Sequence, residues 1–275
     1  MRAEFNEVLT KEYYDSFGDV YEAIWNEQIH TGFFGNTTNK SLSEAVGDMN
    51  SHIAEKADIN KGLILNVGCG RGATDRFLAK HYGVKVIGID VSSNQLREAK
   101  KRAKKESLEQ RIVYTQCSMT QVPYPNNTFD YLWIQESFFH CHDKLSAVKE
   151  FKRVLKGTGR LVLEDTVITD QKAKKEVLEK FGQRVKINDI LTPAEYKELF
   201  STNGFIFRDE ENLSKDLART YEMIIKYIRD NKEKLQQSIP SEYRARLSQD
   251  FGFPDSLRLV KEQKLGCVLM IFDKL

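Results

Sequence analysis

The chain has 275 residues, of which 40% are hydrophobic, so it is long enough for one domain with a large insertion or for two small domains. Its 42 basic and 40 acidic residues give a net charge of +2, which leaves no strong field to attract nucleic acid or a membrane surface. We therefore expect no nucleic-acid or membrane partner, and the sequence has no run of 18 apolar residues that would predict a transmembrane span.

The cysteines argue for a reducing environment. Cys69, Cys117, Cys141 and Cys267 form neither a CxxC pair nor a Cys/His array with zinc spacing, so we expect no metal site. Cys117 and Cys267 lie in apolar strand-like runs, and we interpret them as small core residues. Together with the lack of a signal peptide after Met1, this cysteine usage predicts a cytoplasmic protein.

The first 57 residues are predicted to be helical, and we interpret them as an N-terminal lid. Their apolar stripe recurs at helical spacing and comprises Tyr13, Phe17, Tyr21, Ile24 and Trp25. Packing of an amphipathic helix explains most of this stripe. Tyr14 falls outside it and is therefore our candidate for a substrate contact from the lid. A second helix is expected over residues 41–56.

Residues 58–275 alternate between predicted strands and helices. The strands are expected at 62–67, 84–89, 111–117, 129–135, 158–166, 204–210 and 264–273. The helices are expected at 72–82, 92–106, 143–154 and 192–202. This alternation predicts an α/β, Rossmann-like, seven-stranded and mostly parallel sheet whose last strand is antiparallel. Segments at about 168–192 and 213–250 interrupt the pattern, and we interpret them as helical cap insertions.

A glycine-rich turn between the first predicted strand and helix is the main sign of ligand binding. Gly68, Gly70 and Gly72 follow the apolar run 63–67, and glycine lets a backbone close tightly and approach a ligand. Asp90 ends the next strand, twenty residues after Gly70, where a carboxylate can accept hydrogen bonds from ribose hydroxyls. This pattern also satisfies a dinucleotide motif, and a tight turn with Asp90 as a helix cap is the structural alternative.

Four segments resemble, in order, the motifs of the class I S-adenosylmethionine-dependent methyltransferases. They are residues 65–72 (LNVGCGRG), 86–92 (VIGIDVS), 123–130 (PYPNNTFD) and 155–161 (LKGTGRL). The N-terminal segments at 13–15 and 29–32, with Trp25, are similar to a small-molecule branch of that family. This branch includes sarcosine/dimethylglycine N-methyltransferases, tocopherol-type C-methyltransferases and sugar O-methyltransferases.

The resemblance implies S-adenosyl-L-methionine as cofactor and a small metabolite as methyl acceptor. The methyl group would move by in-line displacement to nitrogen, oxygen or activated carbon. The cofactor-binding residues that the resemblance implies are Asn66, Gly68, Gly70, Gly72, Asp90, Val91, Gln95, Ser118, Met119 and Gln135. Asn66 and Ser118 stand where many relatives carry an acidic residue, which would weaken their contacts to the cofactor.

His140 is the candidate base, because it lies just beyond the fourth predicted strand and the carboxyl ends of parallel strands open onto the ligand crevice. Asp165 ends the fifth strand, and the sugar O-methyltransferases imply a His/Asp pair at these positions. Positioning of the acceptor and a purely structural role are the alternatives for His140. His30 is expected to contact cofactor or acceptor, the alternative being a locally satisfied loop histidine.

Two other functions compete with this hypothesis. An NAD-dependent oxidoreductase would need a Tyr-x-x-x-Lys type of site, which is missing at Tyr196 and Tyr221. A catalytically inactive cofactor-binding protein is the second, and the intact glycine turn and Asp90 argue against it. The sequence leaves open whether the chain is a monomer or a homo-oligomer.

Overall fold

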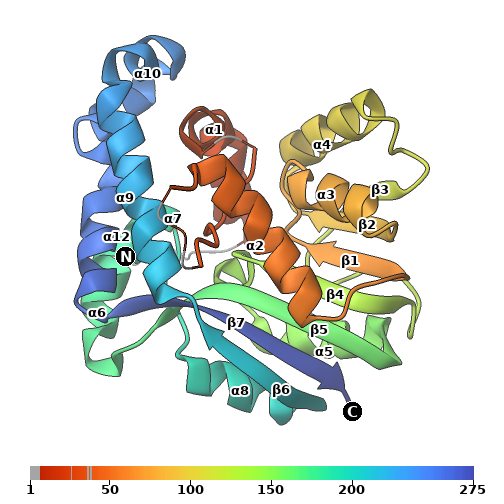
Figure 1. Cartoon of the computed structure of the whole chain (residues 1–275). Helices are drawn as coiled ribbons and strands as arrows, with labels where there is room; N and C mark the ends of the chain where they lie inside the picture. The colour runs from red at the N-terminus through yellow and green to blue at the C-terminus, as the bar shows by residue number, and fades with distance from the viewer. Residues whose placement is uncertain (1–6, 26, 36, 38) are drawn as a thin grey trace.

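The described residues of the computed structural model, 7–275 apart from 26, 36 and 38, form a seven-stranded sheet flanked by helices (Figure 1). The strand order is β3-β2-β1-β4-β5-β7-β6, and β7 is antiparallel to both β5 and β6. This confirms the expected α/β, Rossmann-like sheet with its antiparallel last strand. Residues 1–6 of the expected N-terminal lid lie outside the described part of the chain.

The strands are β1 (Leu63–Val67), β2 (Lys85–Asp90), β3 (Ile112–Gln116), β4 (Phe129–Gln135), β5 (Leu155–Ile168), β6 (Phe205–Asn212) and β7 (Leu265–Lys274). The helices outside the cap segments are α1 (Glu7–Trp25), α2 (Leu42–Lys56), α3 (Ala73–His81), α4 (Ser93–Lys105), η1 (Phe138–His140), α5 (Lys144–Val154) and α8 (Pro193–Ser201). The first cap segment holds η2 (Gln171–Ala173), α6 (Lys174–Val177), η3 (Leu178–Gly182) and α7 (Gln183–Val185). The second holds α9 (Ser214–Asp230), α10 (Lys232–Ser238), η4 (Ser241–Tyr243), α11 (Arg244–Leu247), η5 (Asp250–Gly252) and α12 (Phe253–Lys261).

Side chains of the central strands alternate between two apolar cores, as the period of a strand requires. In β1, Ile64 packs into the core that α2, α3 and α4 cover, whereas Leu65 and Val67 pack into the core that α5 and α8 cover. Both faces of the sheet are thus buried, which explains the continuous apolar run in this strand.

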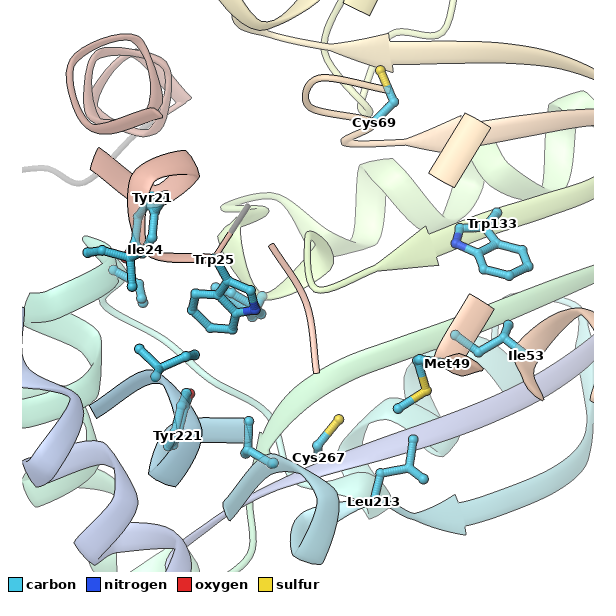
Figure 2. Close-up of a cluster of buried hydrophobic side chains, with 14 of the residues drawn as sticks. Tyr21, Ile24, Trp25, Met49, Ile53, Cys69, Trp133, Leu213, Tyr221 and Cys267 are labelled. Carbon is cyan, nitrogen blue, oxygen red and sulfur yellow. The ribbon is translucent and has the colours of Figure 1, made fainter. Parts of the chain in front are cut away.

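The cap helices extend the first of these cores. Figure 1 shows α1 between α9 and α4, with α12 packed beside α9. Tyr21 and Trp25 of α1 and Tyr221 of α9 reach into one apolar cluster that also contains Met49 of α2 (Figure 2). The N-terminal helix and the second insertion are therefore joined by buried side chains rather than lying apart.

The second insertion differs from the expected continuous helical segment over 213–250. Helix α10 ends at Ser238 because Pro240 disfavours helical backbone at Ile239, which is extended (φ −87°, ψ 149°). A further helix, α12, was not predicted. Its signal is present in the sequence as Gly252 followed by Pro254, since glycine permits the left-handed residue before the helix (φ +79°) and proline is favoured in the first helical turn.

Strand β5 begins at Leu155, three residues before the expected start, because Leu155 pairs with Phe129 across an irregularity in β4. Cys267 is buried in β7 as expected, whereas Cys117 lies just beyond β3 and is only half-buried. Among the described helices, none is long and apolar enough to cross a membrane.

Candidate active site

A cavity lies at the carboxyl ends of β1, β2 and β4. The turns after these three strands form one side, and Thr10 and Tyr14 of α1 together with residues 27–30 form another. Of the predicted site residues it is lined by Tyr14, His30, Asn66, Gly68, Gly70, Asp90, Val91, Gln95, Met119, Gln135 and His140. Gly72, Ser118 and Asp165 are not among the residues that line it.

The three glycines of the turn have different reasons to be glycine. All adopt positive φ, at +72° for Gly68, +53° for Gly70 and +70° for Gly72. A Cβ on Gly68 would meet Ser137 at 2.5 Å, and one on Gly72 would meet the Tyr114 hydroxyl at 2.0 Å. A Cβ on Gly70 would point into open space. Gly70 therefore borders open space in the cavity, whereas Gly72 is required by packing and by the start of α3.

Asp90 is held beside this turn by backbone groups. One carboxylate oxygen accepts the Gly70 N–H at 3.0 Å, and the other accepts the Ser92 N–H at 2.8 Å. Burial raises its pKa, while these hydrogen bonds act in the opposite direction. Asp90 thus braces the glycine turn and the start of α4, as the structural alternative expects, and it also lines the cavity. Its contact with ribose hydroxyls stays a prediction.

The other residues that the sequence analysis assigned to the cofactor differ in what they contact. Val91 and Met119 line the cavity, but the Ser118 hydroxyl hydrogen-bonds the Thr120 hydroxyl at 2.7 Å and accepts the Thr120 N–H. The Asn66 amide donates to the buried Asp75 at 2.6 Å. The side-chain oxygen of Gln135 accepts hydrogen bonds from Trp133 Nε1 at 3.1 Å and from the Thr74 hydroxyl at 3.2 Å, and a hydrogen bond from the Gln135 amide acts to lower the pKa of Glu164. The side-chain amide nitrogens of Asn66 and Gln135 are thus both engaged within the protein.

Helix α1 is fastened over the cavity by polar contacts from the glycine turn and α4. Arg71 pairs with Glu22, which also pairs with Arg102 at 2.7 Å. Gln95 donates to the backbone carbonyl of Tyr14 at 3.2 Å and accepts from Arg71 at 3.1 Å. Gln95 thus lines the cavity and also ties three elements together.

Tyr14 and His140 meet although they are 126 residues apart. The Tyr14 hydroxyl lies 2.8 Å from His140 Nε2, and the two rings pack edge to face. Burial lowers the pKa of His140 to about 3, and the positive charges of His142, Lys144 and Arg184 also act to lower it. His140 is therefore neutral near pH 7, and its second ring nitrogen, Nδ1, is buried without a partner among the described residues.

The structure does not bring Asp165 to His140 in the hydrogen-bonded pair that the sequence suggested. Asp165 is fully buried and accepts the Tyr196 hydroxyl of α8 at 2.6 Å. Burial raises its pKa to about 8, so this carboxyl is largely protonated at neutral pH. The physical reason for the difference is that Tyr196, which is also fully buried, needs a partner for its hydroxyl and finds it in Asp165.

His30 is buried, and its Nδ1 donates to the carbonyl of Thr31 at 3.0 Å. Burial lowers the pKa of His30 to about 4, so the ring is neutral and its Nε2 is a bare acceptor. This Nε2 is buried without a partner in the described residues, while the residue lines the cavity. The local alternative for His30 thus accounts for one ring nitrogen, and the other is free to accept a hydrogen bond from a ligand.

Glu136 is a cavity residue that the sequence analysis did not single out. Its backbone is left-handed (φ +42°), an uncommon conformation for this residue type, and one carboxylate oxygen accepts both the N–H and the hydroxyl of Thr31. Behind it, Glu164 accepts the Cys267 thiol at 2.9 Å. The available signal was a carboxylate directly after Gln135 at the end of a predicted strand.

Burial governs the protonation of this acidic group. Burial raises the pKa of Glu136. It raises the pKa of Glu164 well above the ordinary range, and the negative charge of Glu136 raises the Glu164 pKa further. One carboxylate oxygen of Glu136, one of Glu164 and the Cys267 sulfur lie within 4.8 Å of one another. Burial therefore disfavours the charged form of both carboxyls, more strongly for Glu164, and Glu136 is the one of the two that lines the cavity.

Comparison with known proteins shows which class of protein this chain is similar to. Residues 65–163 match a family model described as a methyltransferase domain. The chain is 33% identical over 159 residues to methyltransferase GfsG of Streptomyces halstedii, covering 57% of each. It is 25% identical over 246 residues to the sarcosine/dimethylglycine N-methyltransferase of Halorhodospira halochloris, covering 86% of each.

Among solved structures, a sarcosine dimethylglycine methyltransferase from Galdieria sulphuraria, described as putative by its own title, superposes with a TM-score of 0.83. The match covers 93% of this chain and 97% of that one at 22% identity, so it bears on the fold alone. The chain spans 42–62% of the length of three of the curated relatives that it matches.

The fold, the glycine turn with Asp90 and the match of residues 65–163 to a methyltransferase domain agree, and the class of proteins to which this chain is similar is the S-adenosylmethionine-dependent methyltransferases. Within that class its relatives act on small molecules, as the sarcosine/dimethylglycine and tocopherol enzymes do by name. The cofactor of such methyltransferases is S-adenosylmethionine, and the open space beside Gly70 and the half-buried Asp90 at the edge of the cavity fit such a molecule.

Proposed function

We propose that this protein transfers a methyl group from S-adenosylmethionine to the nitrogen of a small amine. One observation carries the proposal: a single cavity joins Gly70 and Asp90 at one end to Tyr14, His140 and the Glu136 carboxylate at the other. A carboxylate beside the acceptor position favours a molecule that arrives as a cation. The curated relatives covered over most of their length include N-methyltransferases, which supports this choice.

The cofactor end would be held by Gly70 and Asp90, with Gln135, Val91 and Met119 around it. S-adenosylmethionine supplies a methyl group that is already activated as part of a sulfonium. The protein therefore has to align the acceptor and exclude water, and alignment alone can supply roughly 7–11 kcal/mol of the barrier lowering. Helix α1 would exclude water from the cavity, since its residues Thr10 and Tyr14 line one side of it.

The acceptor end would remove one proton and orient one lone pair. An ammonium has no lone pair, so it must lose its proton before the nitrogen can take the methyl group. Glu136 is the group that we assign to this proton, because it is a cavity carboxylate whose pKa is raised by burial. Neutral His140, fixed by Tyr14, would orient the acceptor through hydrogen bonding rather than act as a strong base.

Transfer to a hydroxyl is the second candidate, since His140 Nε2 already faces a hydroxyl group, that of Tyr14. A hydroxyl acceptor would displace or share this contact, and relatives that methylate oxygen include the 27-O-demethylrifamycin SV enzyme of Amycolatopsis mediterranei. Glu136 distinguishes the two, because a neutral hydroxyl does not need a carboxylate to attract it.

The test is transfer of an isotopically labelled methyl group from S-adenosylmethionine to a panel of small amines and matched alcohols, with products identified by mass spectrometry. We expect labelled N-methyl products, and turnover that falls about 10²-fold or more in Glu136→Gln, the low end of a typical acid–base contribution. Thr31→Val, which removes one hydroxyl donor to Glu136 while keeping the carboxylate, is the matched control. Labelled products from alcohols alone would contradict the nitrogen assignment.

A further inference from the structure

Asp75 of α3 is a fully buried carboxyl group in direct contact with the lining of the cavity. Its Oδ1 accepts a hydrogen bond from Asn66 Nδ2 at 2.6 Å, and Asn66 is a buried residue that lines the cavity. An ionised carboxylate only accepts hydrogen bonds, so Asp75 fixes which end of the Asn66 amide turns toward it. The carbonyl oxygen of Asn66, which accepts no hydrogen bond from the described residues, is thus the end left for a ligand.

The sheet leaves room for this carboxyl group. Asn66 of β1, Gly88 of β2 and Tyr114 of β3 lie side by side in register, on the face of the sheet against which α3 packs (Figure 1). A Cβ on Gly88 would meet Asp75 Oδ2 at 2.7 Å, so any other residue there would displace the carboxyl group. The Tyr114 hydroxyl lies beside the glycine turn, 2.0 Å from the position that a Cβ on Gly72 would take. Asp75 therefore occupies a space that the backbone of β2 leaves open next to the glycine turn.

The surroundings of Asp75 let it ionise near neutral pH. Burial raises its pKa to about 7, and the negative charge of Asp90 also raises it. Hydrogen bonds from its two partners on β1 and β3 and the charge of Arg76 lower it. The other titratable groups that face it, the Tyr114 hydroxyl and the Cys69 thiol, stay neutral because burial raises the pKa of both. A cation bound at the cavity end of this contact would therefore favour the ionised form of Asp75.

We propose that Asp75 is a positioning residue for the cofactor, which turns the carbonyl oxygen of Asn66 toward the α-amino group of S-adenosylmethionine and places a negative charge behind it. A neutral amide alone holds an ammonium weakly. A carboxylate that accepts from the amide nitrogen polarises the amide and makes its oxygen a stronger acceptor. This inference rests on the cofactor of the proposed function and not on the methyl acceptor, so it can be measured by binding without any turnover.

The experiment compares S-adenosylhomocysteine with its deamino analogue, in which hydrogen replaces the α-amino group, by calorimetric titration of the full chain at pH 8. We expect S-adenosylhomocysteine to bind at least about tenfold more tightly, because the analogue lacks a charged hydrogen-bond donor. Asp75→Leu, which removes the acceptor for Asn66, should reduce this ratio to about twofold or less. Asp75→Asn restores an acceptor oxygen without the charge, and its ratio should lie between those two. Tyr114→Phe removes the other partner of Asp75 and is the matched control, so it should leave the ratio unchanged.

Two outcomes would overturn the proposal. A ratio in Asp75→Leu equal to that of the unaltered protein would do so, because a merely structural Asp75 would weaken binding of both ligands alike. Failure of S-adenosylhomocysteine to bind the unaltered protein would overturn the cofactor assignment together with this inference. Tight binding of both ligands with equal affinity would leave the cofactor in place and remove the contact between Asn66 and the amino group.

Proton release by the unaltered protein keeps the test decisive if Asp75→Leu does not fold. At pH 7 about half of the Asp75 carboxyl groups carry a proton, and an ammonium beside Asn66 should displace it. Calorimetry in two buffers of different ionisation enthalpy should therefore detect more protons released by S-adenosylhomocysteine than by the deamino analogue, by up to about half a proton per site. Both ligands carry the same ribose, so any proton from Asp90 cancels in the difference. Equal proton release by the two ligands would contradict the role of Asp75.

Discussion

The residues that line the cavity differ in whether local backbone or a distant element fixes their position. Gly70 needs only its backbone, which is left-handed and open to a ligand. Asp90 is fixed by two backbone N–H groups, so its geometry is local and the sequence could predict it from spacing alone. His140, in contrast, is oriented by Tyr14 of α1. Both residues were predicted site residues, but their hydrogen bond could not be predicted from the sequence.

Replacing Asp90 with alanine should weaken binding of S-adenosylmethionine by about 10²-fold or more, because hydrogen bonds to a charged acceptor are worth roughly 1.5–3 kcal/mol each. Calorimetric titration measures the effect, and circular dichroism checks that the fold is retained. Asp230→Ala, on the exposed end of α9, should leave the affinity unchanged. An unchanged affinity in Asp90→Ala would remove this residue from the cofactor site.

Replacing His140 with alanine should lower kcat by about 10²-fold while the affinity for S-adenosylmethionine stays within about twofold, since the residue lies at the acceptor end. Tyr14→Phe removes only the hydroxyl and should lower kcat by about tenfold for the same reason. Because the pKa of His140 is about 3, the unaltered protein should show no limb from this histidine in its pH–rate profile between pH 5 and 8. Parallel losses of rate and cofactor affinity would show instead that His140 is structural.

At the scale of elements, local patterns predicted the central sheet well, and tertiary partners decided the rest. The apolar runs of β1, β2 and β4 are buried on both faces, so their hydrophobicity alone identifies them. The pairing of Asp165 with Tyr196 could not be read from sequence, because it depends on how α8 packs against β5. Asp75 was hidden for a similar reason, since its partner Asn66 lies in β1 and the space for it is left by Gly88 of β2.

Helix α1 should control exchange of the cofactor, because Glu22 pairs with Arg71 of the glycine turn and Arg102 of α4. Exchanging Glu22 for glutamine removes both charge pairs, each worth roughly 0.2–1 kcal/mol, and should speed cofactor release about two- to tenfold. Stopped-flow displacement at low salt measures the rate, and added salt should narrow the difference between the proteins. Glu98→Gln, which removes the exposed pair with Lys101 within α4, is the control and should not change it. Equal release rates for Glu22→Gln and the unaltered protein would show that α1 is not held by these charges.

For the whole molecule, the buried carboxyls predict how stability depends on pH. Burial raises the pKa of Asp165 to about 8 and that of Asp75 to about 7, against about 3.9 for an unfolded aspartate. Between these values the folded state binds more protons than the unfolded one, so the free energy of unfolding should fall as pH rises from about 4 to 8. Asp165→Asn keeps an acceptor for Tyr196 without the proton, and should flatten this fall in urea unfolding experiments. A slope equal to that of the unaltered protein would contradict the protonated state of Asp165.

The central claim is that one cavity holds S-adenosylmethionine above Gly70 and beside Asp90, and calorimetric titration of the purified chain tests it most directly. We predict that S-adenosylmethionine and S-adenosylhomocysteine each bind with one-to-one stoichiometry and that NAD gives no signal. Binding of NAD alone would contradict the account, because the same glycine turn would then serve a dinucleotide.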